Sequence, residues 1–288
     1  MTLPLRDAMR EILEGWRGDL DPDWREIVRG AELGFDAMDS ALTLEPWEPV
    51  FPARKGKRYP GAPRKAHIFH AFDSIDPDGV RIVVLGQDPY PCGAFSTGRA
   101  FEAGNVAAWR ELEKMFSVSV RTFMLQIAAA RTNDESYAGS VAEWPRLRKE
   151  IEAGAFAIEA PADIADRWVR QGVLLLNSAL TLSRFAVEGD PHQTRGHLPL
   201  WRPFISAVLE HIAARGAPVA FIGFGEQAAD ALAAARIPGG ADGSASNGGV
   251  ACFLRKHPAR GDEVLRLPNP FVLANRHLAA MGASPVDW

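Results

Sequence analysis

Four short apolar runs are the clearest feature in the pattern of hydrophobic and polar positions along the chain. Each run is followed directly by a glycine or a polar residue. Runs of four or five apolar residues with such boundaries are typical of strands that are buried on both faces of a sheet. We therefore predict strands at 81–85, 173–176, 218–222 and 250–254.

The stretches before and between these runs have helix-like patterns. Helices are predicted at 5–15, 23–42, 108–116, 119–130, 161–171, 201–214 and 226–236. The segment 44–65 is rich in Pro, Gly, Arg and Lys, which favours a surface loop. The segment 131–160 is ambiguous.

Strands that alternate with helices favour a parallel sheet with helices on both faces. We expect an α/β fold, a three-layer α/β/α sandwich around a short, mostly parallel four-stranded sheet. The chain shows no internal repeat and no long linker between two kinds of composition. Residues 1–288 are therefore expected to form a single domain, with residues 1–65 as a helical and loop part packed on it.

Composition narrows the class of protein further. The 288 residues are 47% hydrophobic, which is enough for a sizeable core, and the net charge of −4 does not advertise a nucleic-acid binder. Basic clusters at 54–58, 64–65 and 255–260 are most simply explained as solvated surface. The chain has two cysteines, no apolar run long enough to span a membrane and no signal-peptide pattern. These features favour a cytoplasmic protein, and we expect a monomer.

Polar residues follow the predicted strands at the points where ligands bind in parallel sheets. The sequence Gly-Gln-Asp-Pro-Tyr (86–90) follows the first strand, Asn177 the second, and Gly225 and His257 come shortly after the third and fourth. Each has a simpler explanation, because Asp88 before a proline is a common turn residue and Asn177 could cap a helix. His257 could be an ordinary loop residue.

Taken together, these side chains make a coherent chemical set. A carboxylate can position water or stabilise a developing cation, and a neutral histidine can donate to an oxygen that gains negative charge. An amide such as that of Asn177 offers a donor and an acceptor for the edge of a pyrimidine. An aromatic ring such as Phe101, by default a core residue, can stack on a flat base. The set suits cleavage of a bond between a sugar and a planar leaving group.

Several motifs resemble those of the main family of uracil-DNA glycosylases. The stretch 68–90, with its Gly-Gln-Asp-Pro-Tyr, looks like the family's approach to its water-activating motif. The stretch 169–182 is similar to the strand that ends in a uracil-reading asparagine, and 256–258 looks like the start of the His-Pro motif. The closing residues resemble the family's C-terminal helix and final Pro-hydrophobic-Asp-Trp. The resemblance runs discontinuously from about residue 68 to residue 288.

The resemblance implies a role for each matching residue. Asp88 would orient the attacking water and stabilise the oxocarbenium-like sugar, and His257 would donate to O2 of the leaving uracil. Phe101 would stack on uracil, and Asn177 would bind its O4 and N3 edge. Tyr90 would exclude the methyl group of thymine. The backbone near Gln87 would help to hold O2.

The chain also departs from the family pattern. Pro91 replaces the histidine that follows the first motif, which removes a backbone donor and stiffens the turn, so the rate is expected to change more than the reaction. Ser119 corresponds to a serine of the family's phosphate-contacting loop. Gly225 is followed by Glu226 where the family has a phosphate-binding serine. A wedge leucine does not stand at the matching place after His257. We consider Leu265, Leu267 or Arg260 as substitutes, or no wedge at all.

The resemblance implies a monofunctional DNA-repair enzyme that begins base excision. It would release uracil from single- or double-stranded DNA by base flipping, with free uracil as a product and without a metal or organic cofactor. Two alternatives stay open from the sequence. The protein could act on another damaged or deaminated base, or it could be a non-catalytic DNA-binding protein on the same scaffold.

Overall fold

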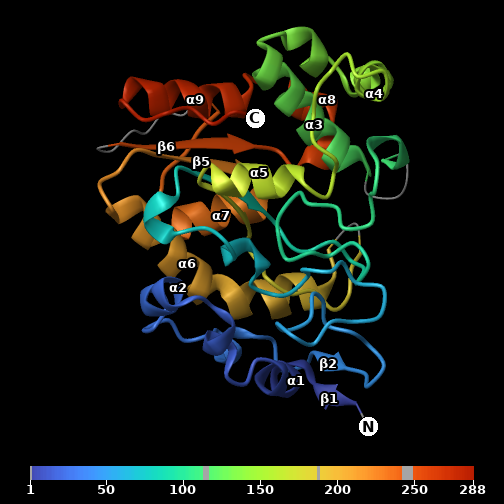
Figure 1. The fold of residues 1–288 in the computed structure, drawn as a ribbon. Helices are drawn as coiled ribbons and strands as arrows, with labels where there is room; N and C mark the ends of the chain where they lie inside the picture. Colours follow the sequence, from blue (N-terminus) through green and yellow to red (C-terminus); the bar gives the residue numbers. More distant parts are fainter. Residues whose placement is uncertain (1, 113–116, 187–188, 242–248) are drawn as a thin grey trace.

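A four-stranded parallel sheet crosses the middle of the computed structural model, which describes residues 2–112, 117–186, 189–241 and 249–288 (Figure 1). The strand order is β4-β3-β5-β6. The strands are β3 (Ile82–Gly86), β4 (Val173–Asn177), β5 (Val219–Phe224) and β6 (Val250–Arg255). All four predicted strands are confirmed, with ends that differ by no more than two residues.

The apolar runs are continuous because each strand buries both of its faces. Along β3, Val83 and Leu85 belong to one hydrophobic cluster, whereas Ile82 and Val84 belong to the cluster on the other face. This alternation follows the two-residue period of a strand. The two clusters are the two hydrophobic cores of a sandwich, as expected for a parallel sheet. The cluster with Val83 and Leu85 is here called the inner core, and the cluster with Ile82 and Val84 the outer core.

Helices cover both faces of the sheet (Figure 1). Below it in this view lie α1 (Leu5–Ile12), α2 (Pro22–Ile27), α6 (Leu198–Ala214) and α7 (Glu226–Ala234). The other cluster is built mainly by α3 (Ser117–Thr132), α4 (Trp144–Glu152), α5 (Ile164–Arg170), α8 (Asp262–Leu265) and α9 (Pro270–Ala280). The predicted α/β/α fold class is thereby confirmed.

Short elements complete the described structure. A small antiparallel pair joins β1 (Leu3–Pro4) to β2 (Thr43–Leu44). Single 3-10 turns occur at Trp16–Asp19, Phe35–Ala37, His70–Phe72, Pro77–Gly79, Trp109–Glu111, Glu135–Ala138, Val141–Glu143 and Pro258–Arg260, and a π turn spans His192–His197. None of the described helices is long and apolar enough to cross a membrane.

The prediction of one helix at 23–42 was wrong beyond Ile27. A side chain at Gly34 would place its Cβ atom 2.3 Å from the carbonyl oxygen of Pro199, so the chain passes α6 here as irregular backbone. The predicted helix at 108–116 is a single 3-10 turn at Trp109–Glu111, and residues 113–116 lie outside the described residues. The ambiguous segment 131–160 contains α4 and two 3-10 turns.

The N-terminal part contributes side chains to the same core as the sheet. The Trp24 ring is 1% exposed and meets the Phe72 ring edge-on at 5.0 Å. Its indole Nε1–H donates to the carbonyl oxygen of Ile75 at 2.8 Å. Both rings lie in the cluster that includes Val83 and Leu85 of β3. The N-terminal helices and the sheet therefore share buried contacts.

We expect the Trp24→Ala variant to lower the free energy of unfolding by about 3–5 kcal/mol, because it empties a buried aromatic site and orphans a buried carbonyl. Denaturant unfolding followed by far-ultraviolet circular dichroism would measure this. The exposed Arg29→Ala change is the control, with an effect of about 0.5 kcal/mol or less. A separate early transition in the wild type would contradict a shared core.

Candidate active site

The chain leaves β3 through Gly86, and this position brings two of the predicted site residues together. Gly86 pairs with Asn177 in the parallel register of β3 and β4. A Cβ atom at Gly86 would lie 2.7 Å from Asn177 Oδ1 and 3.5 Å from Cε2 of Phe101. Only glycine leaves room for both groups at this edge of the sheet.

Backbone hydrogen bonds fix the turn that follows Gly86. The Ser178 N–H donates to the Gly86 carbonyl at 3.0 Å, and the Ala179 N–H donates to the Gln87 carbonyl at 2.9 Å. The Ser178 hydroxyl donates to the same Gly86 carbonyl at 2.9 Å. The residue after β4 therefore holds the polypeptide that carries Gln87 and Asp88.

Asp88 is half-buried and accepts a short hydrogen bond from the side-chain amide of Gln193 at its Oδ2 atom. Burial raises the pKa of the Asp88 carboxyl to about 6, and hydrogen bonds from the Gln193 and Gln87 side chains oppose this rise. A carboxylate with such a pKa is ionised at neutral pH but is poorly hydrated. Strongly shifted carboxyl groups of this kind are typical of functional sites.

Sequence reasoning missed Gln193. It lies in the π turn His192–His197, between β4 and α6, and only 2% of its surface is exposed. π turns are uncommon and occur frequently at functional sites. The sequence signal was weak, since it consisted of two histidines and a glutamine within 191–197, outside any strand end.

A chain of buried hydrogen bonds holds this π turn. The Trp201 indole can only donate, and it donates to Thr181 Oγ1 at 2.7 Å. Thr181 Oγ1 is also hydrogen-bonded to Nδ1 of His197, and His197 Nε2 is hydrogen-bonded to Ser183 Oγ, both at 2.8 Å. Ser183 Oγ is hydrogen-bonded in turn to Nδ1 of His192 at 2.8 Å. The indole fixes the direction of the first bond, and the tautomers of the two histidines set the direction of the others.

The protonation state of the two imidazoles follows from their burial. Burial lowers the pKa of His197 to about 3, with a smaller effect from His192. Burial likewise lowers the pKa of His192. Both rings are therefore neutral at physiological pH and can each donate with one nitrogen and accept with the other. The π turn that presents Gln193 to Asp88 is set by these bonds.

Phe101 has an unusual backbone conformation for a bulky residue, with φ of 61°. Left-handed conformations outside glycine store about 1–3 kcal/mol of strain and cluster at functional sites. The Phe101 ring stacks on Phe123 with centroids 4.7 Å apart and meets Phe224 edge-on at 5.2 Å. The strained backbone thus seats the ring beside Gly86 instead of deep in the core.

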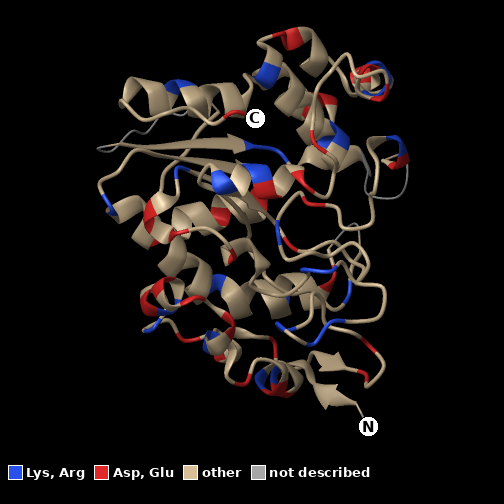
Figure 2. Ribbon diagram, viewed as in Figure 1, with Lys and Arg blue, Asp and Glu red and all other residues tan. Residues whose placement is uncertain are grey.

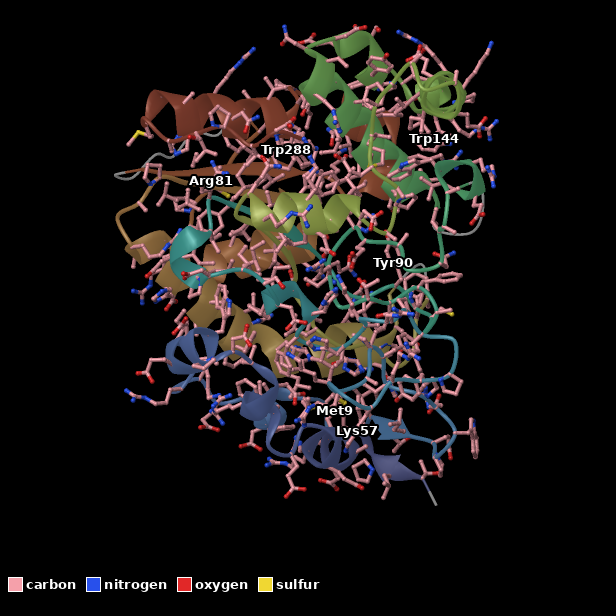
Figure 3. All side chains as sticks on the ribbon, in the orientation of Figure 1. Met9, Lys57, Arg81, Tyr90, Trp144 and Trp288 are labelled. Atoms are coloured by element: carbon pink, nitrogen blue, oxygen red, sulfur yellow. The ribbon has the colours of Figure 1, made fainter. Side chains whose placement is uncertain are left out.

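Tyr90 is half-buried and packs against the same hydrophobic cluster as Phe101. Burial raises the pKa of the Tyr90 phenol above its ordinary value, so the hydroxyl is neutral. Figure 3 labels Tyr90 beside the loops that follow β3. Its position is close in sequence to Asp88, across the buried Pro89.

His257 follows β6 and packs over Gly225, which follows β5. A Cβ atom at Gly225 would lie 3.5 Å from Cβ and Cδ2 of His257, and Gly225 has a φ of 91°. The Ala259 N–H donates to His257 Nδ1 at 3.2 Å, which leaves the ring proton on Nε2. The surrounding protein lowers the pKa of His257 by removing water from the ring, and Arg260 lowers it further. His257 is therefore a neutral donor through Nε2.

The predicted DNA-contact residues differ in accessibility. Ser119 is half-buried in the first turns of α3, and Gly225 is buried. Arg260 is exposed in the turn after His257. The prediction that Leu265 could serve as a wedge is corrected. Its side chain is 8% exposed and packs with Val264 in the outer core, where it cannot enter a duplex. Leu267 is half-buried.

Among the residues that the structure describes, His67, His70 and Asp73 form the one group with the spacing of a metal site, with ligand atoms within 4.8 Å. His67 Nε2 donates to Asp73 Oδ2 at 2.7 Å, and its Nδ1 accepts from Phe69 N–H at 3.2 Å. The Lys55 ammonium lies 3.1 Å from Asp73 Oδ1. Because the carboxylate and the His67 nitrogens already have partners, the cluster fits an internal polar network better than a metal site.

Three strand ends and the segment that carries Phe101 therefore present different chemistry at one edge of the sheet. Asn177 and Phe101 meet over Gly86, Asp88 lies two residues further on, and His257 lies on the far side of β5. The arrangement offers a flat ring for stacking, an amide for an edge, an ionised carboxylate and a neutral donor. It can hold a planar heterocycle and stabilise opposite charges on the two sides of a breaking bond.

Comparison with known proteins gives consistent relatives. No protein-family model matches the chain. The uracil-DNA glycosylase of Exiguobacterium sibiricum is 30% identical over 209 residues, which are 71% of this chain and 73% of that protein. The uracil-DNA glycosylase of Sinorhizobium medicae is 28% identical over 290 residues and covers 98% of this chain and 92% of its own length.

Solved structures share the fold. The crystal structure of UNG from Nitratifractor salsuginis superposes with a TM-score of 0.56 at 23% identity, covering 96% of both chains. A mimivirus UNG variant in complex with UGI gives a TM-score of 0.57 at 16% identity, covering 93% of this chain and 88% of that one. At these identities the likeness shows the fold alone. The sequence match to the Exiguobacterium protein goes further, and on it the chain belongs to the uracil-DNA glycosylase family.

Proposed function

We propose that this protein hydrolyses the N-glycosidic bond of deoxyuridine in DNA, releasing uracil and leaving an abasic site. The observation that carries the proposal is the convergence of the Asn177 amide and the Phe101 ring over Gly86, close to the half-buried carboxylate of Asp88. This combination fits a flipped pyrimidine whose sugar lies next to Asp88. A base inside a duplex cannot reach such a pocket, so the target nucleotide must leave the stack.

Base recognition follows from the residues around Gly86. One face of the Phe101 ring would stack on the uracil ring. The other face of Phe101 stacks on Phe123. The Asn177 amide would donate to O4 and accept from N3–H. The neutral Tyr90 side chain would occupy the space beside C5 and so reject the methyl group of thymine. The backbone at Gln87 would contribute to the hold on O2.

Bond cleavage places opposite charges on the sugar and the base. The C1′–N1 bond breaks and its electron pair leaves with uracil, while the oxygen of a water molecule forms a bond to C1′ and one proton of that water passes to the Asp88 carboxylate. Asp88, as an ionised carboxylate, would first stabilise the positive sugar and orient that water. His257 Nε2–H would donate to O2 as negative charge builds there. These steps use one water molecule and the chain's own side chains.

Gln193 has a role in the same step. Its amide donates to the Asp88 carboxylate, which favours the ionised form and fixes the orientation of the carboxyl group. Pro91 stands where the family pattern has a histidine after the first motif. Gln193 would therefore supply Asp88 with a polar partner that the turn itself lacks. A cytoplasmic location and a monomeric state stay predictions from the sequence.

Uracil release from a uracil-containing oligonucleotide tests the proposal. We expect Asp88→Asn and His257→Ala each to lower the single-turnover rate by about 100-fold or more, because each removes a group that acts in the transition state. The exposed Asp230→Asn change on α7 is the matched control and is expected to keep the wild-type rate. Absence of release by folded wild-type protein from both single and double strands would overturn the proposal.

The pH dependence tests the state of Asp88. Since its folded pKa is raised to about 6, the rate should fall about tenfold for each pH unit below that value. The Gln193→Met change removes a donor to the charged form, so the pKa should rise and the acidic limb should move to higher pH. A Gln193→Met profile with an unchanged midpoint would contradict this role.

Folding stability provides the control for the same variants. The raised pKa means that ionised Asp88 destabilises the folded state above about pH 6, and that this penalty disappears as the carboxyl protonates at lower pH. Asp88→Asn should therefore not lower the free energy of unfolding at pH 7. Denaturant titration at pH 7 would show this, and a loss of stability would mean that the rate defect reflects unfolding.

Strand preference tests the wedge. Because Leu265 is buried, we expect faster uracil release from single strands than from the matched duplex, where stacking must first be broken. Arg260→Ala and Leu267→Ala, compared in single turnovers on both substrates, would identify a substitute for the wedge. A several-fold loss confined to the duplex would assign the residue. Equal rates on both substrates in the wild type would contradict the expected preference for single strands.

A further inference from the structure

One surface loop carries a concentration of positive charge that the proposed catalytic steps do not use. Residues 54–65, here called the basic loop, contain six Lys and Arg residues and no Asp or Glu. The whole chain has a net charge of −4, so this loop opposes the overall balance. Figure 2 shows blue segments in the loops between the N-terminal helices and the sheet, and Figure 3 labels Lys57 among them.

Three of the six cations anchor the ends of the basic loop. Arg54 forms a two-pronged ion pair with Asp19, in which both side chains are largely buried. The Lys55 ammonium lies 3.1 Å from Asp73. At the other end, the Lys65 ammonium lies 2.7 Å from Asp166. These three ion pairs attach the two ends of the basic loop to the rest of the protein.

The other three cations have no such use. Lys57, Arg58 and Arg64 are exposed, and no carboxylate among the described residues comes within 4.0 Å of their charged nitrogens. A long charged side chain loses entropy when it is fixed in an ion pair. Because these three cations have no carboxylate partner within the described residues, they are available for an external anion. The anchored ends limit how far the middle of the basic loop can move.

The basic loop packs beside the segment that carries Phe101. A Cβ atom at Gly104 would lie 2.2 Å from Cγ of Pro63, and the Gly104 N–H donates to the Phe95 carbonyl at 3.1 Å. The His67 N–H donates to the Thr97 carbonyl at 3.2 Å. The loop therefore packs on the segment 95–104, which carries Phe101.

An exposed aromatic side chain lies in the segment that precedes the basic loop. Trp47 is 77% exposed, far more than any other tryptophan or phenylalanine among the described residues. Its neighbour Glu48 is held by Arg184 at 2.5 Å and 2.7 Å. The Tyr59 hydroxyl donates to the Val50 carbonyl at 3.0 Å, which ties the basic loop to the segment that carries Trp47.

We propose that Trp47 and the three unpaired cations bind single-stranded DNA beside the nucleotide that enters the pocket. The cations would contact phosphates, and the Trp47 ring would stack on an unpaired base. A charged track with an aromatic platform is the usual design for a single strand. Glu226 gives a reason for the arrangement, because an acidic side chain next to Gly225 is a poor partner for a phosphate. The inference rests on DNA as the substrate.

Salt dependence of binding tests the cations directly. The probe is a fluorescent thymine homopolymer without uracil, and anisotropy gives its affinity over a range of salt concentrations. Loss of three phosphate contacts in the triple variant Lys57→Gln, Arg58→Gln and Arg64→Gln should lower the slope of log affinity against log salt by about 2. Arg276→Gln, an exposed cation on α9, which covers the other face of the sheet, is the matched control and should keep the wild-type slope.

Stacking is tested with the same probe. Trp47→Ala should weaken binding to the single strand by roughly tenfold, and Trp47→Phe should restore most of the affinity because it keeps an aromatic face. A matched duplex offers no unpaired base, so its affinity should change much less in Trp47→Ala. Equal losses with both probes, or no loss with either, would overturn the stacking assignment.

The outcome is separable from that of the proposed function. If the triple variant keeps the wild-type slope, or if Arg276→Gln loses as much, the surface proposal is wrong even when the wild type releases uracil. If the wild type releases no uracil but the slope and the Trp47 effect appear as expected, the enzyme proposal is wrong and the surface stands. All the substituted side chains are exposed, and thermal melting would confirm that the variants fold.

Discussion

The close approach of two parallel strands at Gly86 is the constraint on which the rest of the site depends. The register of β3 and β4 places Gly86 opposite Asn177, and the missing side chain leaves room for the Asn177 oxygen and the Phe101 ring. Any larger residue would push these groups apart by removing the space between them. The position of Asp88, two residues beyond, follows from the same register.

Two features of this site are energetically unfavourable for the folded state. Phe101 keeps a left-handed backbone, and Asp88 keeps a charge at a half-buried position with a pKa near 6. Both are tolerated because the surroundings are rigid. Phe123 and Phe224 pack against the ring, and the buried hydrogen bonds from Trp201 to His192 hold the turn that presents Gln193. The inner core and the catalytic edge are therefore connected through ordinary packing and hydrogen bonds.

The sequence predicted the features that depend on local pattern. The four strands are short, continuous and apolar because both faces are buried, and polar residues follow them where a parallel sheet exposes its edge. Gln193 could not be predicted in this way, because its contact with Asp88 joins residues 105 positions apart through a π turn. Leu265 was misjudged because its burial depends on how α8 packs in the outer core. The prediction of a helix at 23–42 was wrong for a similar reason, since the backbone at Gly34 packs closely against the Pro199 carbonyl, a contact distant in sequence.

A crystal structure with uracil bound would test the central claim most directly. The account predicts that the ring lies flat against Phe101, with its O4 and N3 edge at the Asn177 amide and O2 within hydrogen-bond reach of His257 Nε2. Asp88 should then lie on the side of N1, where the sugar is attached. Uracil bound elsewhere, or in this pocket with its O4 and N3 edge turned away from Asn177, would contradict the account.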